Sequence, residues 1–192
     1  MLAPQEQSQF AYSSLKPIRD NIQNSLAPPT ITTVPIDSDK DGLVDSYNIT
    51  LRIKKPLANL ALRELNVLLA FDFEISDIVK MRMEGILAVN INAMSSPTLS
   101  ASKLSTTGHL KLRQPNALSQ SPKVRDVYSD NYFDSLQVQS MESFLFNYQQ
   151  KRNETLFYSY NKQIQYGSQN YIDLEMTIDV PKQDVLYTPK FW

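Results

Sequence analysis

Apolar and polar residues alternate with a period of two along most of the chain. The clearest alternation covers residues 46–54, where the polar set is Asn48, Thr50, Arg52 and Lys54 and the apolar set is Tyr47, Ile49, Leu51 and Ile53. Because neighbouring side chains of a strand point to opposite faces, this pattern predicts a half-buried strand. Further strands are predicted at residues 30–36, 67–75, 81–93, 108–114, 155–164 and 172–180.

One segment late in the chain departs from this period. Between residues 135 and 152, apolar side chains recur at helical spacing, and they are Met141, Phe144, Leu145 and Tyr148. Asp134 or Ser135 could cap the start of a helix there. We therefore expect one amphipathic helix in this segment.

Together these patterns predict an all-β fold, an antiparallel β-sandwich of roughly six to eight strands with one helix inserted late in the chain. Residues 1–28 are polar, rich in Gln, Ser and Asn and punctuated by prolines, which indicates a leader or linker. Residues 29–192 then form a single β-sandwich domain. The segments 95–107 and 115–130 are expected to be connections without strands, because Ser, Thr and Pro are frequent in the first and the second begins at a proline.

Composition narrows the functional classes. The 192 residues carry 19 Lys+Arg and 20 Asp+Glu, so the chain lacks the excess of basic residues that indicates nucleic-acid binding. There is no cysteine, which excludes disulfides, zinc–thiolate sites and cysteine nucleophiles. The single histidine, His109, has no serine or carboxylate pattern around it that indicates a triad, and we expect it on a strand surface. No apolar run approaches the roughly 20 residues that a membrane-spanning helix needs.

The strongest chemical signal is the nine-residue segment 37–45, which joins two predicted strands. Its aspartates, Asp37, Asp39, Asp41 and Asp45, fall at positions 1, 3, 5 and 9, and Gly42 falls at position 6. This is the spacing of a loop that wraps Ca²⁺ with hard oxygen ligands. The carbonyl of Leu43 would complete the ligand set, with Asp45 ligating directly or through water.

The alternative for this loop is a solvated acidic turn, because Asp and Gly are frequent in turns. An EF-hand helix pair is excluded, because its position 12 would hold a bidentate Glu and here holds Asn48, which lies on a predicted strand. We expect calcium to be structural, as a clamp that orders the turn, because no base or nucleophile lies nearby.

Two N-glycosylation sequons are present, Asn48-Ile49-Thr50 and Asn153-Glu154-Thr155. Asn48 lies on the polar face of its predicted strand, and Asn153 follows the predicted helix. Both positions could project a glycan into solvent. The alternative is that both are ordinary polar surface residues.

Other residues allow a second interpretation. Strand carboxylates (Asp72, Glu74, Asp173 and Glu175) could form a glycosidase pair, although alternation already explains them as solvent-facing. Aromatic residues around the helix (Phe144, Phe146, Tyr148, Phe157, Tyr158 and Tyr160) could form a ligand surface, although core packing explains their spacing. The rival to an interaction module is therefore a carbohydrate-binding or glycan-processing β-sandwich.

Taken in order along the chain, several stretches resemble the transmembrane protein 231 family of the ciliary transition zone. They are residues 37–45 followed by the alternating strand and 55–57, then 108–114, 148–155 with its sequon, and 180–192. The resemblance covers about residue 29 to the end, and it rests on the order and spacing of the stretches.

The resemblance implies that this is the extracellular domain of a membrane-anchored protein, positioned between two spans that this chain lacks. It implies a non-enzymatic role in the tectonic-like (Meckel syndrome) complex, with tectonic and B9-domain proteins as partners. That complex contributes to the barrier that controls ciliary membrane composition and to ciliogenesis. The implied location is the extracellular face of the ciliary membrane at the transition zone.

Overall fold

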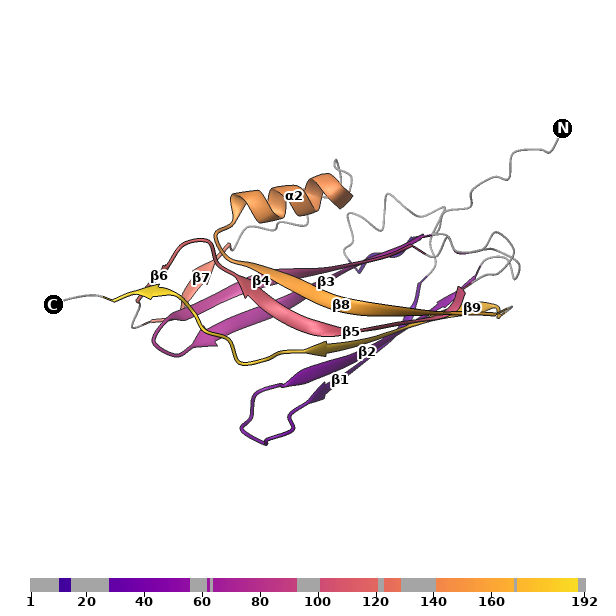
Figure 1. The fold of residues 1–192 in the computed structure, drawn as a ribbon, viewed down its shortest axis with the longest axis horizontal. Helices are drawn as coiled ribbons and strands as arrows, with labels where there is room; N and C mark the ends of the chain where they lie inside the picture. Colours follow the sequence, from indigo (N-terminus) through magenta and orange to yellow (C-terminus); the bar gives the residue numbers. More distant parts are fainter. Residues whose placement is uncertain are drawn as a thin grey trace.

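The computed structural model describes residues 11–14, 28–55, 62, 64–92, 101–120, 123–128, 141–167 and 169–189. Its larger sheet has five strands in the order β1-β2-β9-β5-β8 (Figure 1). These are β1 (Thr30–Ile36), β2 (Ser46–Lys54), β9 (Tyr171–Asp179), β5 (Ala101–Arg113) and β8 (Thr155–Tyr166). All pairs are antiparallel except β5 and β9, which run parallel.

A second sheet has three strands in the order β3-β4-β7. The long strands β3 (Glu64–Ser76) and β4 (Lys80–Asn92) form an antiparallel hairpin, and the short β7 (Arg125–Val127) runs parallel to β4. A small parallel pair joins β6 (Leu118–Ser119) to β10 (Tyr187–Thr188) near the end of the chain.

The two main sheets pack face to face around one hydrophobic core. Buried side chains from β2, β4, β5, β8 and β9 belong to a single cluster, with half-buried residues of β3 against it. Ile91, Leu104, Leu174 and Ile178 are fully enclosed in this cluster. This arrangement confirms the all-β fold, with one helix among the described residues, and the shared core is what a β-sandwich requires.

The alternating pattern predicted the faces of the strands correctly. In β2, Ile49 and Leu51 are buried while Asn48 and Arg52 are exposed. In β9, Ile172, Leu174, Met176 and Ile178 are all buried. Apart from β5 and the short β6, β7 and β10, the observed strands lie within a few residues of the predicted ones, since alternation is a direct consequence of one buried face.

Three expectations about the connections and sheets were wrong. Residues 101–107 form the first half of β5, because β8 and β9 supply hydrogen-bonding partners on both sides and its Ser and Thr side chains fit a strand. The segment 115–130 contains β6 and β7. The sheets are also mixed, because the chain between β5 and β9 crosses over through the helix and β8 and so allows a parallel pair.

The helix α2 (Met141–Lys151) lies on the outer face of the three-stranded sheet (Figure 1). Phe144 and Tyr148 are buried against Ile86 of β4, with Leu68 and Leu145 beside them. The predicted start of this helix, residues 135–140, lies outside the described residues, as do most of the leader 1–28 and the segment 95–100.

Side chains close the edge of β4 that faces β8. The Tyr148 hydroxyl accepts hydrogen bonds from the backbone N–H of Ile86 and of Leu156, each at 3.1 Å. The Tyr160 hydroxyl accepts from Asn90 N at 3.1 Å and donates to Asn90 O at 2.9 Å. Tyrosine side chains therefore hold the two sheets together here, in place of backbone pairing.

The chain after β9 is tied to β5 by glutamine side chains. Gln183 accepts from Leu112 N at 2.8 Å and donates to Leu110 O at 3.1 Å. Gln114 of the following turn bonds the backbone N–H and C=O of Leu186 in the same manner. These contacts continue the sheet's hydrogen bonding past the point where β9 ends.

Candidate functional site: the acidic loop of the β1–β2 hairpin

The acidic loop, residues 37–45, is the turn of the β1–β2 hairpin. It lies at the tip of the hairpin, which projects away from the second sheet (Figure 1). Its base is closed by Asp45 N, which donates to Ile36 O at 2.8 Å. Val180 N donates to Asp45 O at 2.7 Å, so the chain leaving β9 also holds the loop.

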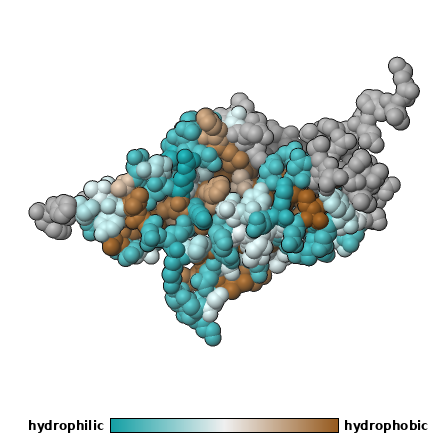
Figure 2. Space-filling view, in the orientation of Figure 1, coloured by the Kyte–Doolittle hydropathy of each residue, from teal (hydrophilic) through white to brown (hydrophobic). Residues whose placement is uncertain are grey.

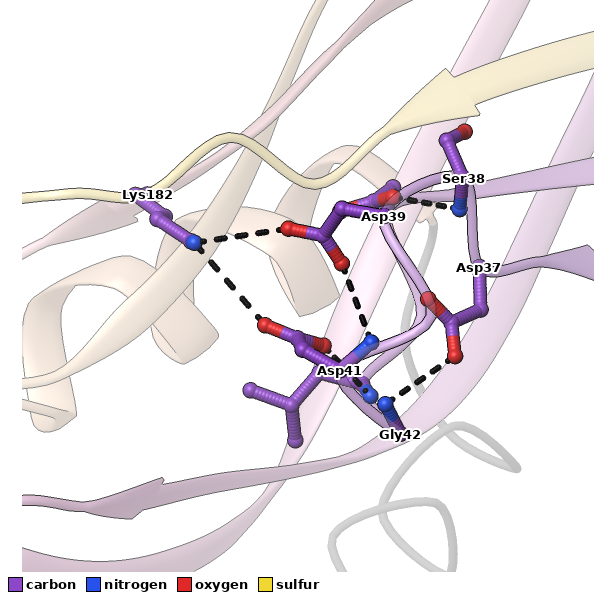
Figure 3. A network of polar contacts seen from close by, with 8 residues as sticks. Asp37, Ser38, Asp39, Asp41, Gly42 and Lys182 are labelled. Carbon is purple, nitrogen blue, oxygen red and sulfur yellow. Dashed lines mark hydrogen bonds and ion pairs between the residues drawn. The ribbon is translucent and has the colours of Figure 1, made fainter.

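Each aspartate of the loop accepts a hydrogen bond from a backbone N–H (Figure 3). Asp37 Oδ2 accepts from Gly42 at 3.0 Å, and Asp45 Oδ2 accepts from Ser38 at 2.7 Å. Asp39 Oδ1 and Asp41 Oδ1 accept at 3.2 and 2.8 Å from the N–H two residues later. In each carboxylate, one oxygen thus accepts a hydrogen bond from the loop backbone, and the second oxygen can bind another partner.

Positive φ angles make the sharp turn. Gly42 has φ 87° and Lys40 has φ 61°. Glycine adopts this conformation without steric conflict, whereas lysine does so at a cost of order 1 kcal/mol. The positive φ of Gly42 gives a physical reason for a glycine at position 6 of the loop.

The loop brings together three of the predicted ligands. Asp37, Asp39 and Asp45 each contribute a carboxylate oxygen within 4.8 Å of the other two. With Ca²⁺–oxygen distances of about 2.3–2.6 Å, ligands on opposite sides of one ion lie up to about 5 Å apart, so this spacing fits calcium. Asp41 does not join this group, and the side chain of Leu43 is 64% exposed.

A lysine from the far end of the chain contacts the same loop. Lys182 Nζ lies 3.7 Å from Asp39 Oδ2 and 3.8 Å from Asp41 Oδ2 (Figure 3). Its side chain is 84% exposed, so water screens this pairing and a divalent ion could displace it. Sequence analysis missed Lys182, because nothing local in the sequence marks a residue that reaches the loop only through the β2–β9 pairing.

The two sequons lie in different environments. Asn48 is exposed in the middle of β2 on the outer face of the five-stranded sheet. Its Oδ1 accepts a hydrogen bond from Thr177 Oγ1 at 3.1 Å, and its Nδ2 has no hydrogen-bond partner among the described residues. A glycan on Nδ2 would therefore extend away from the sheet.

Asn153, in contrast, is built into the turn after α2. Its Nδ2 donates to Glu154 Oε1 at 2.7 Å and to Asn116 O at 3.3 Å. Its Oδ1 accepts from the backbone and side chain of Asn116 at 3.0 and 2.8 Å. Thr155, the third sequon residue, is only 3% exposed. In the folded chain this side-chain amide is already used for structure.

Buried charges surround that turn. Arg152 and Glu154 are 5% and 3% exposed. Tyr128 donates to Glu154 Oε2 at 2.6 Å and packs its ring under the Arg152 guanidinium at 4.5 Å. Burial, with the hydrogen bond to Glu154, raises the pKa of the Tyr128 hydroxyl. This network fixes the end of α2 against β4, where Arg152 also donates to Glu84 O at 2.9 Å.

Comparison of the sequence with models of known protein families assigns the chain to one family. The family model described as Transmembrane protein 231 matches residues 1–192, which is the entire chain. The chain belongs to the transmembrane protein 231 family. No curated protein and no solved structure matches significantly. The family is one of ciliary transition-zone membrane proteins, and it is not known for an enzymatic activity.

The features that favoured a glycan-processing enzyme take other roles in this member of the transmembrane protein 231 family. Glu74, Asp173 and Glu175 form ion pairs with Arg82, Arg52 and Lys103 on exposed faces of the sheets. Among the described residues, the open cleft between Thr30, Arg52 and Tyr171 has no carboxylate in its lining. A glycosidase needs two carboxylates in one cleft, and this cleft does not supply them.

The aromatic residues divide between core and surface. Phe144, Tyr148 and Tyr158 are buried, whereas Phe146 and Phe157 are 64% and 51% exposed. Figure 2 shows a mostly hydrophilic face on which apolar patches are small and separate.

His109 lies on the surface of β5, with its Nδ1 3.3 Å from Asp179 Oδ2. Within the described ranges, no helix is both long and apolar enough to cross a bilayer.

Proposed function

We propose that this chain is a non-enzymatic interaction domain on the extracellular face of the ciliary membrane at the transition zone. The single observation that carries the proposal is the family match over residues 1–192. Two spans outside this chain would anchor the domain. Its partners would be tectonic and B9-domain proteins of the tectonic-like (Meckel syndrome) complex, and through them it would contribute to the ciliary diffusion barrier and to ciliogenesis.

Proximity labelling with the anchored full-length protein tests this role. We expect tectonic proteins to be labelled by the wild-type protein. Labelling should fall when Asp37, Asp39 and Asp45 are all changed to Asn, because the projecting hairpin loses its ordered tip. The matched control is Asp184→Asn, an exposed aspartate of the C-terminal segment that contacts no loop carboxylate among the described residues. Absence of transition-zone proteins from the wild-type labelling would overturn the proposal.

The loop's role in this proposal is a structural calcium clamp. The support is that Asp37, Asp39 and Asp45 converge at a spacing that one Ca²⁺ can bridge, while the backbone already holds them in place. Calcium would neutralise carboxylates that otherwise repel one another, and it would stiffen the hairpin. It supplies charge and rigidity only, which agrees with a loop that carries no nucleophile.

Isothermal titration of the purified chain with Ca²⁺ tests the clamp separately from the partners. We expect binding in the range of about 10⁻⁴–10⁻³ M that is typical of extracellular modules, together with a rise in melting temperature. Asp45→Asn should abolish both effects, and Asp184→Asn should preserve them. If millimolar calcium produces no binding heat and no thermal stabilisation, the calcium clamp is refuted. The family-based role would be unaffected by that result.

Glycosylation is proposed at Asn48 and examined at Asn153 by the same experiment. In secreted protein from glycosylating cells, Asn48→Gln should remove a mass shift that a peptide N-glycosidase also removes. Asn153→Gln should leave that shift in place, because its amide is bonded to Asn116 and Glu154. A glycan at Asn153 alone would contradict the geometry of both sites.

A further inference from the structure

Among the described residues, no strand pairs with the outer edge of β1, which is the least covered part of the five-stranded sheet. Six of its seven residues are exposed, and only Ile36 is partly buried. Ile31 and Thr33 pair with Leu51 and Ile49, so they share the face that elsewhere forms the core. Ile31 nevertheless remains 49% exposed. Among the described residues, the second sheet does not extend over this strand (Figure 1).

The backbone direction of β1 can be deduced from its turn. The carbonyl of Ile36 accepts from Asp45, so it points toward β2. Because backbone groups alternate along a strand, the groups of Pro35, Thr33 and Ile31 point away from β2 to the open edge. Pro35 has no N–H, so its position on this side leaves the β1–β2 ladder intact.

Prolines bracket the groups that a further strand could use. Pro29 precedes β1 and Pro35 lies near its end, and neither can donate a hydrogen bond. The open edge therefore offers a donor and an acceptor at Ile31 and at Thr33. Prolines at both ends restrict which registers another strand can take.

The two ends of the hairpin carry opposite charge. The acidic loop lies at the C-terminal end of β1. At the other end, Lys54 lines an open cleft of about 430 Å³ together with Pro28, Thr30, Asn170, Tyr171 and Arg52, whose guanidinium is already paired with Asp173. An antiparallel copy of the same edge would place its acidic end beside this basic end.

We propose that two copies of this chain associate edge to edge through antiparallel β1 strands. Ile31 of each copy exchanges both backbone hydrogen bonds with Thr33 of the other, and the prolines lie outside this pair. The acidic loop of one copy then lies near Lys54 of the other. About two strand spacings, or roughly 10 Å, separate the loop from the β2 strand that carries this lysine. That separation exceeds the Debye length of about 8 Å at physiological salt, so the attraction acts mainly at low ionic strength.

A second copy fits this edge better than an unrelated strand, because the edge is complementary to itself. A two-fold interface requires that the same patch satisfies both partners. Here the donors and acceptors are reciprocal, the acidic and basic ends exchange under the two-fold axis, and Ile31 of each copy packs beside the other. Edge pairing also leaves the outer face of β2, with Asn48, open to solvent.

Sedimentation velocity of the purified chain over a range of concentrations tests the proposal. We expect a reversible monomer–dimer equilibrium in calcium-free buffer. Ile31→Lys should weaken association by roughly tenfold or more, because the interface would bring two unpaired charges together. The matched control is Ile78→Lys, whose isoleucine is 46% exposed at the tip of the β3–β4 hairpin, against 49% for Ile31. Circular dichroism would verify that both variants are folded.

The charge arrangement is tested in the same instrument. Raising the salt concentration should weaken the dimer, and Lys54→Glu should weaken it at low salt. Lys54→Glu combined with Asp39→Lys should recover association. A monomer at every concentration would overturn the proposal and leave the edge to a strand of another protein. Equal effects of the two isoleucine variants, or association beyond a dimer, would also overturn it.

Discussion

The tyrosine that closes the β4 edge offers a quantitative test of how the two sheets are joined. Tyr148 is 1% exposed, and its hydroxyl accepts from Ile86 N and from Leu156 N. Replacing Tyr148 by Phe keeps the ring and removes the hydroxyl, and with it the acceptor for these two N–H groups. Each buried N–H left without a partner costs about 1–3 kcal/mol, so we expect the two together to lower the unfolding free energy by about 2–6 kcal/mol. For a domain stabilised by about 5–15 kcal/mol, this is a large fraction.

Urea denaturation followed by far-ultraviolet circular dichroism measures this change. The transition midpoint should fall while its denaturant dependence stays constant, since the surface exposed on unfolding is unchanged. Tyr187→Phe is the control, because Tyr187 is 39% exposed on the short β10, and it should change stability by less than about 0.5 kcal/mol. A loss below about 1 kcal/mol for Tyr148→Phe would refute the reasoning, since it would show that the two N–H groups find another acceptor.

Three further outcomes follow from the geometry. Gly108→Ala should cost about 3 kcal/mol in a melting or urea experiment, because a Cβ there would lie 2.1 Å from the backbone oxygen of Ser159 and would force β5 and β8 apart. Lys182→Ala should strengthen calcium binding by about twofold to fivefold in titration, since a competing cation leaves the loop. Burial raises the pKa of Tyr128 and of Tyr158, so the folded state holds these protons more tightly than the unfolded state. Their stabilisation should be complete below about pH 10 and be lost as pH rises through the raised values, with a smaller loss in Tyr158→Phe.

The loop and the C-terminal segment form one connected unit. Val180 N donates to Asp45, Lys182 reaches Asp39, and Gln183 bonds the backbone of β5. An ion bound by the loop would therefore act on the segment that leads out of the domain, as well as on the hairpin itself. In a membrane-anchored protein, this connection would link the order of the hairpin tip to the direction in which the chain leaves the sheet.

The two sequon asparagines have different hydrogen-bond surroundings in this chain. Asn48 and Asn153 are indistinguishable as triplets, and both were expected at the surface. The difference arises because Asn116, which comes from the turn after β5, packs against Asn153 and uses its amide. A contact between residues so far apart in sequence leaves no local signal.

Local sequence patterns were sufficient to predict the elements that have one buried face. Alternation in residues 46–54 and 172–180 predicted β2 and β9, because exposure to core and solvent repeats with every second side chain. Helical spacing predicted α2, although its first predicted residues lie outside the described part. The spacing of Asp37, Asp39, Gly42 and Asp45 likewise predicted a tight loop with converging carboxylates, because a short loop positions its own side chains.

Features that depend on partners distant in sequence required the tertiary structure. The Ser- and Thr-rich residues 101–107 became a strand because β8 and β9 pair with both of its edges. The parallel pairing of β5 with β9, the approach of Lys182 to the loop and the open edge of β1 have the same origin. The sequence alone determined which residues face inward and where the acidic turn lies, since both arise within a few neighbouring residues. Strand order decided the rest, because only the assembled sheet determines which edges are paired and which charges meet.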